Sequence, residues 1–209
     1  VLKAIETFDA ATLTTHDARL AFWLNAYNVQ MLQNVIETPS LENIVADGYA
    51  EAYFKTPVLT AQTPMTLDEI EHVILRGEAG RAALAPFQLD TLDPRIHVGL
   101  NCAAISCPRL RQRAFTAANV DAELDAAMRD FTASPRHFRL DDGTYVVSSL
   151  LDWFAADFDR PDQPAGDYLL QYMPDDRPHY DAWQALLAGR TAAALKARDD
   201  VRFAYDWTV

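Results

Sequence analysis

The feature that most constrains the fold is a long helical pattern between Ala18 and Glu37. Cap-type residues at 14–17 precede it and mark a helix start. Apolar residues recur along it at spacings of three and four and cover two faces: Leu20, Phe22, Leu24, Ala26, Tyr27, Val29, Met31, Val35 and Ile36. A helix that is apolar on most sides belongs in the middle of a domain. We therefore expect an α+β fold in which this long buried central helix packs on a small, mostly antiparallel sheet and is surrounded by further helices.

Two asparagines lie within this apolar helix. Asn25 and Asn28 are three residues apart, so they share one side of the helix. A buried amide that finds no hydrogen bond lowers stability. The two side chains therefore either tie the helix to a neighbouring loop or line a polar site, and both interpretations stay open at this point.

Composition narrows the class of protein and of partner. Half of the 209 residues are hydrophobic, which is enough for a full core, and we expect one domain spanning residues 1–209. The formal net charge of −12 argues against nucleic acid and against an anionic membrane surface as partners. No run approaches the ~20 apolar residues of a membrane span. The chain begins at Val1 rather than Met, which leaves both the cytoplasm and an exported, periplasmic location open.

A second helix is predicted from a capping box. Thr66 stands at the cap position and Glu69 follows three residues later. The helix is expected to end near Arg76, because Gly77 follows this basic residue. It displays Glu71, His72 and Arg76, which form ion pairs on a surface helix or, alternatively, contribute to a binding site.

A strand is predicted from Arg95 to Cys102. The preceding Asp93-Pro94 pair favours an extended backbone. Side chains alternate along a strand, so His97 and Asn101 would share a polar face while Cys102 would point into the core.

Both cysteines of the chain lie near this strand, and Cys107 is the candidate nucleophile. Ser106-Cys107-Pro108 is typical of a helix start, with serine as the cap and proline in the first turn. A helix N-terminus and a nearby imidazole lower the pKa of a thiol and favour the reactive thiolate. The hypothesis assigns His97 as general base, with Asn101, or alternatively Asn25 or Asp206, as the residue that orients it. The reaction would be acyl transfer or amide hydrolysis through a thioester.

Three other interpretations of the cysteines are weighed against this one. Cys107 can be a half-buried structural thiol. A Cys102–Cys107 disulfide must meet a strict Cα spacing across the expected strand-to-helix turn. A zinc site of His97, Cys102 and Cys107, with His72 as a fourth ligand, lacks the tight cysteine pairs that structural zinc prefers. We predict neither a metal nor any other cofactor.

The C-terminal part contains a clear hairpin pattern. Short β-type runs at 138–140 and 144–147 flank Asp141-Asp142-Gly143, a strong two-residue turn pattern. A helix from about Ala117 to Thr132 is expected before the hairpin. The residues beyond it read as helices interrupted by prolines.

Several blocks of the chain resemble the domain of unknown function 547 family, which is found in bacteria and, fused to other modules, in plants. They lie at 21–28 (AFWLNAYN), 67–76 (LDEIEHVILR), 93–97 (DPRIH), 100–108 (LNCAAISCP), 148–158 and 205–207. The layout of the family is similar to that of papain-like and transglutaminase-like thiol enzymes, which implies a cysteine-proteinase-like fold. In those enzymes the nucleophilic cysteine begins the central helix, whereas the helix here carries Asn25 and no cysteine.

The sequence thus leaves two functions open. In the first, the protein is a thiol-dependent acyl-transfer enzyme or amide hydrolase that uses Cys107, His97 and Asn101. In the second, it is a non-catalytic binding or scaffold domain whose polar cleft takes a small molecule or a peptide. The candidate binding residues for such a cleft are Asn25, Asn28, His72, Arg76 and Arg95.

Overall fold

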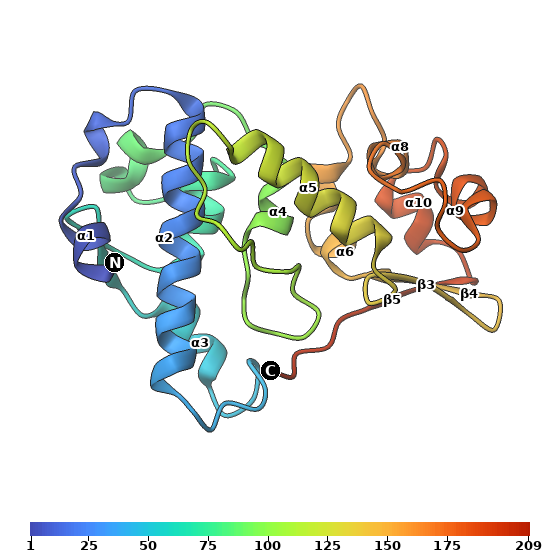
Figure 1. Cartoon of the computed structure of the whole chain (residues 1–209), viewed down its shortest axis with the longest axis horizontal. Coiled ribbons are helices and arrows are strands. Elements are labelled where there is room, and N and C mark those ends of the chain that lie inside the picture. The colour runs from blue at the N-terminus through green and yellow to red at the C-terminus, as the bar shows by residue number, and fades with distance from the viewer. The chain divides into compact units, whose positions relative to one another are not determined.

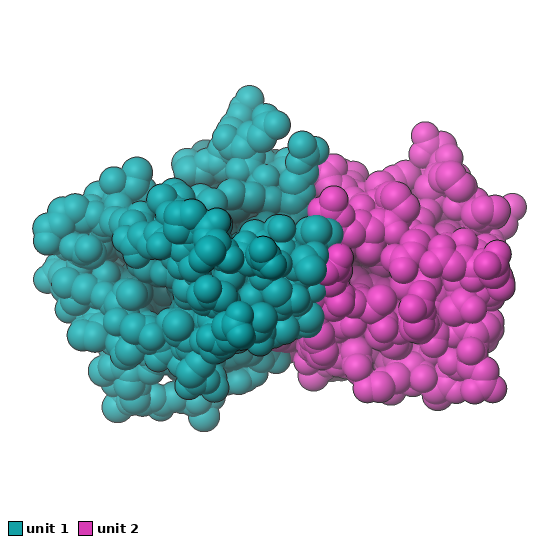
Figure 2. All heavy atoms as spheres, turned by 90° about the horizontal axis from the view of Figure 1, so that it is seen from below, with its two compact units in different colours: residues 1–124, 207–209 teal, residues 125–206 magenta.

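The structure, a computed structural model, describes all residues from 1 to 209 and confirms the α+β class. The chain divides into two compact units, coloured separately in Figure 2. Unit 1 contains residues 1–124 and 207–209, and unit 2 contains residues 125–206. The boundary falls inside helix α5 (Val120–Ala133). The expectation of a single domain stays a prediction.

Helix α2 (His16–Glu37) is the long buried helix predicted from the sequence (Figure 1). Thr15 caps it, because its Oγ1 accepts a hydrogen bond from the Ala18 N–H at 3.2 Å. Trp23 and Leu24 are almost fully buried. Among the contacts of α2 with other elements, the most extensive are with helices η2 (Glu69–Leu75) and α1 (Leu2–Thr7).

The other elements of unit 1 are short. They are η1 (Ala10–Thr12), α3 (Tyr49–Lys55), β1 (Val58–Thr60), β2 (Thr63–Met65), η3 (Ala82–Phe87) and α4 (Ile96–Gly99). Strands β1 and β2 form an antiparallel hairpin that was not predicted. Its turn residues, Ala61 and Gln62, both have positive φ without being Gly, Asn or Asp, so they carry no turn signal.

The predicted capping box is confirmed. The Thr66 N–H donates to Glu69 Oε2 at 2.9 Å, and the Glu69 N–H donates to Thr66 Oγ1 at 3.0 Å. The helix that follows, η2, is a π-helix, in which the Arg76 N–H reaches back five residues to the Glu71 carbonyl. This wider turn changes the spacing of side chains from the ordinary helical period.

Unit 2 contains a three-stranded sheet in the order β3-β4-β5. Strands β3 (Phe138–Asp141) and β4 (Thr144–Ser148) form the predicted hairpin, with positive φ at both Asp142 and Gly143. Strand β5 (Val201–Ala204) pairs parallel to β4 and was not predicted. The helices of unit 2 are α6 (Leu150–Trp153), α7 (Ala155–Phe158), α8 (Ala165–Leu170), α9 (Tyr180–Leu187) and α10 (Ala192–Lys196). In neither unit is a helix both long and apolar enough to span a membrane.

Candidate functional site

The segment around His97 is a helical turn rather than the predicted strand. Asp93 Oδ1 accepts the Arg95 N–H at 2.9 Å, and Pro94 and Arg95 form a turn that leads into helix α4, which begins at Ile96. The Asp-Pro pair therefore marks a helix start here, not an extended lead into a strand. The predicted alternation of faces does not apply, and His97 is buried together with its neighbours Ile96 and Val98.

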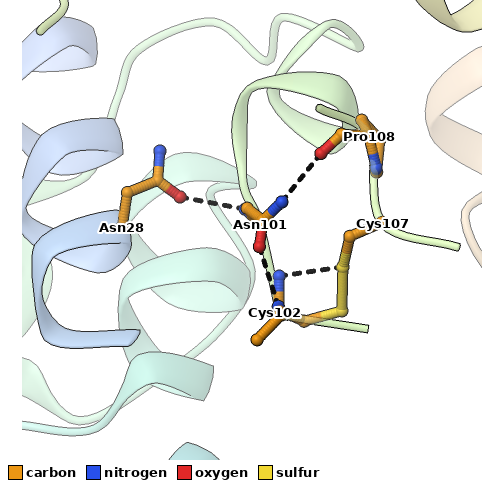
Figure 3. The surroundings of a disulfide bond; sticks show 6 residues. Asn28, Asn101, Cys102, Cys107 and Pro108 are labelled. Atoms are coloured by element: carbon orange, nitrogen blue, oxygen red, sulfur yellow. Dashed lines mark hydrogen bonds between the residues drawn. A yellow bond between two sulfur atoms is a disulfide. The ribbon is translucent and has the colours of Figure 1, made fainter. Parts of the chain in front are cut away.

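Asn28 fixes the chain just after this turn. Its Nδ2 donates to the Gly99 carbonyl at 2.8 Å. Its Oδ1 accepts the Asn101 N–H at 2.9 Å (Figure 3). Asn25 makes the same two-way contact with Phe115, at 2.8 Å to the carbonyl and 2.9 Å from the N–H. Both asparagines therefore tie α2 to neighbouring loops, which was the first of their two interpretations.

The Asn101 side chain makes two hydrogen bonds to the backbone of the residues that follow it. Its Oδ1 accepts the Ala103 N–H at 2.8 Å and its Nδ2 donates to the Pro108 carbonyl at 2.8 Å (Figure 3). This arrangement keeps Ala103 in the left-handed region, with φ of 69°. Asn101 thus connects the two ends of residues 101–108, which we call the bridged segment.

The bridged segment is closed by a disulfide between Cys102 and Cys107, whose Cα atoms are 6.1 Å apart. The expectation of a free Cys107 thiol is wrong for this form of the protein, because neither cysteine is free. The predicted helix start at Ser106 is also wrong: residues 100–115 form turns and irregular backbone. We discounted the disulfide because we expected a strand and a helix to flank it, and without them the strict Cα spacing is met.

Cys107 Sγ also accepts a hydrogen bond from the Cys102 N–H at 2.9 Å. Cys107 is 5% exposed, whereas Cys102 is partly exposed. The two sulfurs of the bond therefore lie in different surroundings.

His97 lies close to an acidic residue that the sequence did not assign to it. Its Nδ1 is 3.9 Å from Glu71 Oε1, and both side chains are largely buried. The sequence left Glu71 either in an ion pair on a surface helix or in a binding site. The π-helical spacing of η2 explains the difference, because an ordinary helical period misplaces the residues that face the interior.

The three predicted cationic or imidazole binding residues each lie beside other charged or imidazole side chains. Arg76 Nη1 lies 2.8 Å from His72 Nδ1, and Arg76 also pairs with Glu78. Arg95 Nη2 is 2.7 Å from a carboxylate oxygen of Asp93 and 2.8 Å from one of Asp121. Their assignment to a ligand site stays a prediction.

One pocket brings two of the predicted site residues together. It contains about 180 Å³ of empty space, part of it open to solvent. Its lining combines one face of α2 with the bridged segment and the loop that follows: Asn28, Met31, Leu32, Val35, Asn101, Ala103 and Leu110. Sequence reasoning identified the two asparagines but missed the aliphatic walls, because those residues read as ordinary core positions of the helix.

No metal site is present among residues 1–209. No group of three or more histidine, cysteine, aspartate or glutamate residues lies close enough together to hold an ion. Cys102 and Cys107, two members of the zinc set weighed above, are bonded to each other.

Comparison with known proteins gives one family. The family described as "Protein of unknown function, DUF547" matches residues 11–132, which are more than half of the chain and include α2, η2, α4 and the bridged segment. No curated protein and no solved structure matches the chain. The likeness to papain-like enzymes stays a prediction. The chain belongs to the DUF547 family.

Proposed function

We propose that unit 1 is a peptide-binding domain that holds one aliphatic side chain in the pocket between α2 and the bridged segment. The pocket carries this proposal. The empty space of about 180 Å³ includes solvent at the open mouth, so the enclosed part is much smaller than a site for a drug-sized ligand. A space of that size suits a single side chain better than a whole cofactor. The aliphatic walls from Met31, Leu32, Val35 and Leu110 favour a side chain of the same kind.

The polar end of the pocket suits the backbone of a peptide. A carboxamide group has two N–H donors. Asn28 uses one of them on the Gly99 carbonyl, and Asn101 uses one on the Pro108 carbonyl. The second N–H of each amide is available for a peptide carbonyl beside the buried side chain.

The bridged segment already pairs with an extended piece of chain within unit 1. The Ile105 N–H donates to the Thr208 carbonyl at 2.6 Å. On its other side, Thr208 forms an antiparallel bridge with Asn43. Backbone pairing of an extended segment is a general mode of peptide recognition, and it supports a peptide rather than a compact small molecule as the ligand.

A pair of variants of α2 tests this proposal. Leu32→Trp fills the pocket from a position that is 45% exposed, so the fold has room for the larger ring. Ile36→Trp is the matched control, because Ile36 is 69% exposed on the same helix and does not line the pocket.

The experiment is selection of a displayed library of random peptides on the three immobilised proteins. The wild-type protein and Ile36→Trp should enrich peptides that share one Leu, Ile, Val or Met position, and Leu32→Trp should not. Equal enrichment by Leu32→Trp, or no enrichment by any of the proteins, would contradict the proposal.

A thiol enzyme is the second candidate function, for the reduced protein. The hydrogen bond from the Cys102 N–H to Cys107 Sγ favours it, because a donor at this sulfur stabilises a thiolate once the disulfide is opened. His97, close to Glu71, would serve as general base, with Asn101 as the orienting residue.

Alkylation by iodoacetamide under reducing conditions tests this second candidate. At neutral pH, Cys107 in the Cys102→Ala variant should react faster than Cys102 in the Cys107→Ala variant. Adding His97→Gln should slow the reaction of Cys107. Equal rates at the two cysteines, with no effect of His97, would remove the catalytic candidate and leave the peptide-binding proposal untouched.

A further inference from the structure

We propose that the Cys102–Cys107 disulfide is a site of thiol–disulfide exchange, at which an external thiolate attacks Cys102 Sγ and Cys107 leaves. The effect of this exchange on peptide affinity rests on the proposed function, whereas the exchange itself does not. Two observations carry the assignment: the greater exposure of Cys102 and the hydrogen bond that Cys107 Sγ accepts.

Exposure favours Cys102 as the attacked residue. Exchange requires a thiolate to reach one of the two sulfur atoms. Cys102 is partly exposed, whereas Cys107 retains 5% of its accessible surface. A thiol from solvent therefore meets Cys102 first.

Hydrogen bonding favours Cys107 as the leaving group. The Cys102 N–H donates to Cys107 Sγ at 2.9 Å, so a donor already faces the sulfur that would gain negative charge. A more stable thiolate leaves faster in exchange. Both observations therefore point in the same direction.

The exchange balances with a dithiol as the reductant. The first thiolate of the dithiol forms a bond to Cys102 Sγ, and the sulfur–sulfur bond to Cys107 breaks, releasing the Cys107 thiolate. The second thiolate of the dithiol then attacks the sulfur of the reductant in this mixed disulfide and releases the Cys102 thiolate. Two electrons pass to the protein, the dithiol becomes a disulfide, and water supplies protons to the released thiolates according to pH.

The disulfide closes a short loop that forms part of the pocket wall. Ala103, which lines the pocket, lies inside this loop with a left-handed backbone. Alanine rarely adopts that conformation without a constraint. When the bond opens, Asn101 remains as the direct hold on Ala103, so we expect the wall to loosen and affinity for an aliphatic peptide to fall.

Trapping of the mixed disulfide tests the direction of attack. The oxidised wild-type protein is incubated with glutathione, a monothiol, under native conditions. N-ethylmaleimide then blocks the released thiols, and the modified peptides are mapped by mass spectrometry. We expect glutathione on Cys102 and maleimide on Cys107, in excess over the reverse pattern by about tenfold. The reverse pattern, an even mixture, or a bond that resists glutathione until the protein is denatured would overturn the proposal.

Hydrogen exchange tests the effect on the pocket wall without any peptide. The amides of Ala103 and Ile105 should exchange faster in the reduced protein than in the oxidised one. The Phe115 amide is the internal control, since Asn25 holds it outside the disulfide loop, and its rate should not change. Unchanged exchange at Ala103 would overturn the loosening. If the peptide selection fails but Ala103 exchanges faster in the reduced protein, the proposed function is contradicted and the thiol–disulfide exchange is not.

Discussion

The bridged segment of unit 1 and the three-stranded sheet of unit 2 are fixed by different means. The sheet is held by regular backbone pairing between β3, β4 and β5. The bridged segment has irregular backbone, and the side chains of Asn28 and Asn101 and a disulfide define its path. Structure held by a few side chains is sensitive to single amide substitutions and to redox state. Structure held by backbone pairing and packing responds instead to changes in volume and to buried charge.

Gly166 in α8 gives the largest expected effect and probes close packing in unit 2. A Cβ at this position would overlap the Leu187 carbonyl oxygen and lie 2.8 Å from the Leu187 carbonyl carbon. Gly166→Ala should lower the free energy of unfolding by about 3–5 kcal/mol, because backbone atoms have to move.

Gly143→Ala is the control for Gly166→Ala. It introduces only left-handed strain, at φ of 83° with nothing within 4 Å, and should lower the free energy of unfolding by about 1 kcal/mol. Urea denaturation measures both variants. A loss at Gly166 no larger than that at Gly143 would show that unit 2 is less tightly packed than described.

His137 gives the second effect, a dependence of stability on pH. Burial, and the nearby Arg136 charge to a smaller extent, lower the pKa of this histidine from 6.5 to about 4. Above pH 6.5 the histidine is neutral in both the folded and the unfolded chain. As pH falls from 6.5 towards 4, the unfolded chain binds a proton that the folded protein does not, so stability falls by up to about 3 kcal/mol.

His137→Leu should remove this part of the pH dependence. No hydrogen bond is lost at Nδ1, which is buried without a partner, and the side chain packs against the Phe131 ring. Denaturation midpoints measured between pH 4 and 7 provide the comparison. A slope in the variant as steep as in the wild-type protein would assign the pH dependence to other groups.

Asn28→Ala is expected to have the third-largest effect. It tests whether side-chain hydrogen bonds define the backbone path of the bridged segment in unit 1. It leaves the Gly99 carbonyl and the Asn101 N–H without their partner, which should cost about 2 kcal/mol. The Ala103 amide should then exchange faster with solvent. Asn25→Ala removes the equivalent contacts at Phe115 and should lower stability without changing Ala103 exchange. If the two variants change the exchange rate of the Ala103 amide equally, the Asn28 hydrogen bonds do not have the particular effect on the bridged segment that is described above.

Thr66→Ala gives the smallest expected effect. It removes one of the two hydrogen bonds of the capping box before η2 and should cost about 1 kcal/mol. Thr66→Ser keeps the hydroxyl group and should restore most of this loss. Thermal denaturation of the two variants measures the difference, and equal melting temperatures would argue against a stabilising cap.

Local patterns in the sequence were sufficient for part of this fold. The apolar period of α2, the capping box at Thr66 and the Asp142-Gly143 turn each depend on residues close together in the chain, and all three are confirmed. Strand β5 depends on parallel pairing with the distant β4, which leaves no local signal. The Ala61-Gln62 turn was missed because its residues are not the usual ones for positive φ.

Some contacts around the candidate site could be predicted from the sequence, but its geometry could not. The tie from α2 to nearby loops through Asn25 and Asn28 followed from the cost of burying an amide. The fold around Cys107 did not follow, because Asp93-Pro94 was interpreted as the extended start of a strand, whereas it leads into the helical turn α4. Because of that error, a strand and a helix were predicted where the structure has a loop, and a disulfide between them was not expected to meet the required Cα spacing.

The most direct test of a preformed pocket is an NMR titration of the oxidised protein with N-acetyl-leucine-N′-methylamide, an aliphatic side chain flanked by two carbonyls. Fragments of this size bind weakly, so millimolar concentrations are appropriate. The account predicts saturable shifts of the Asn28 and Asn101 side-chain amides and of the Ala103 backbone amide, all absent in Leu32→Trp. Shifts that persist in Leu32→Trp, or a wild-type spectrum that does not respond, would contradict the pocket as the binding site.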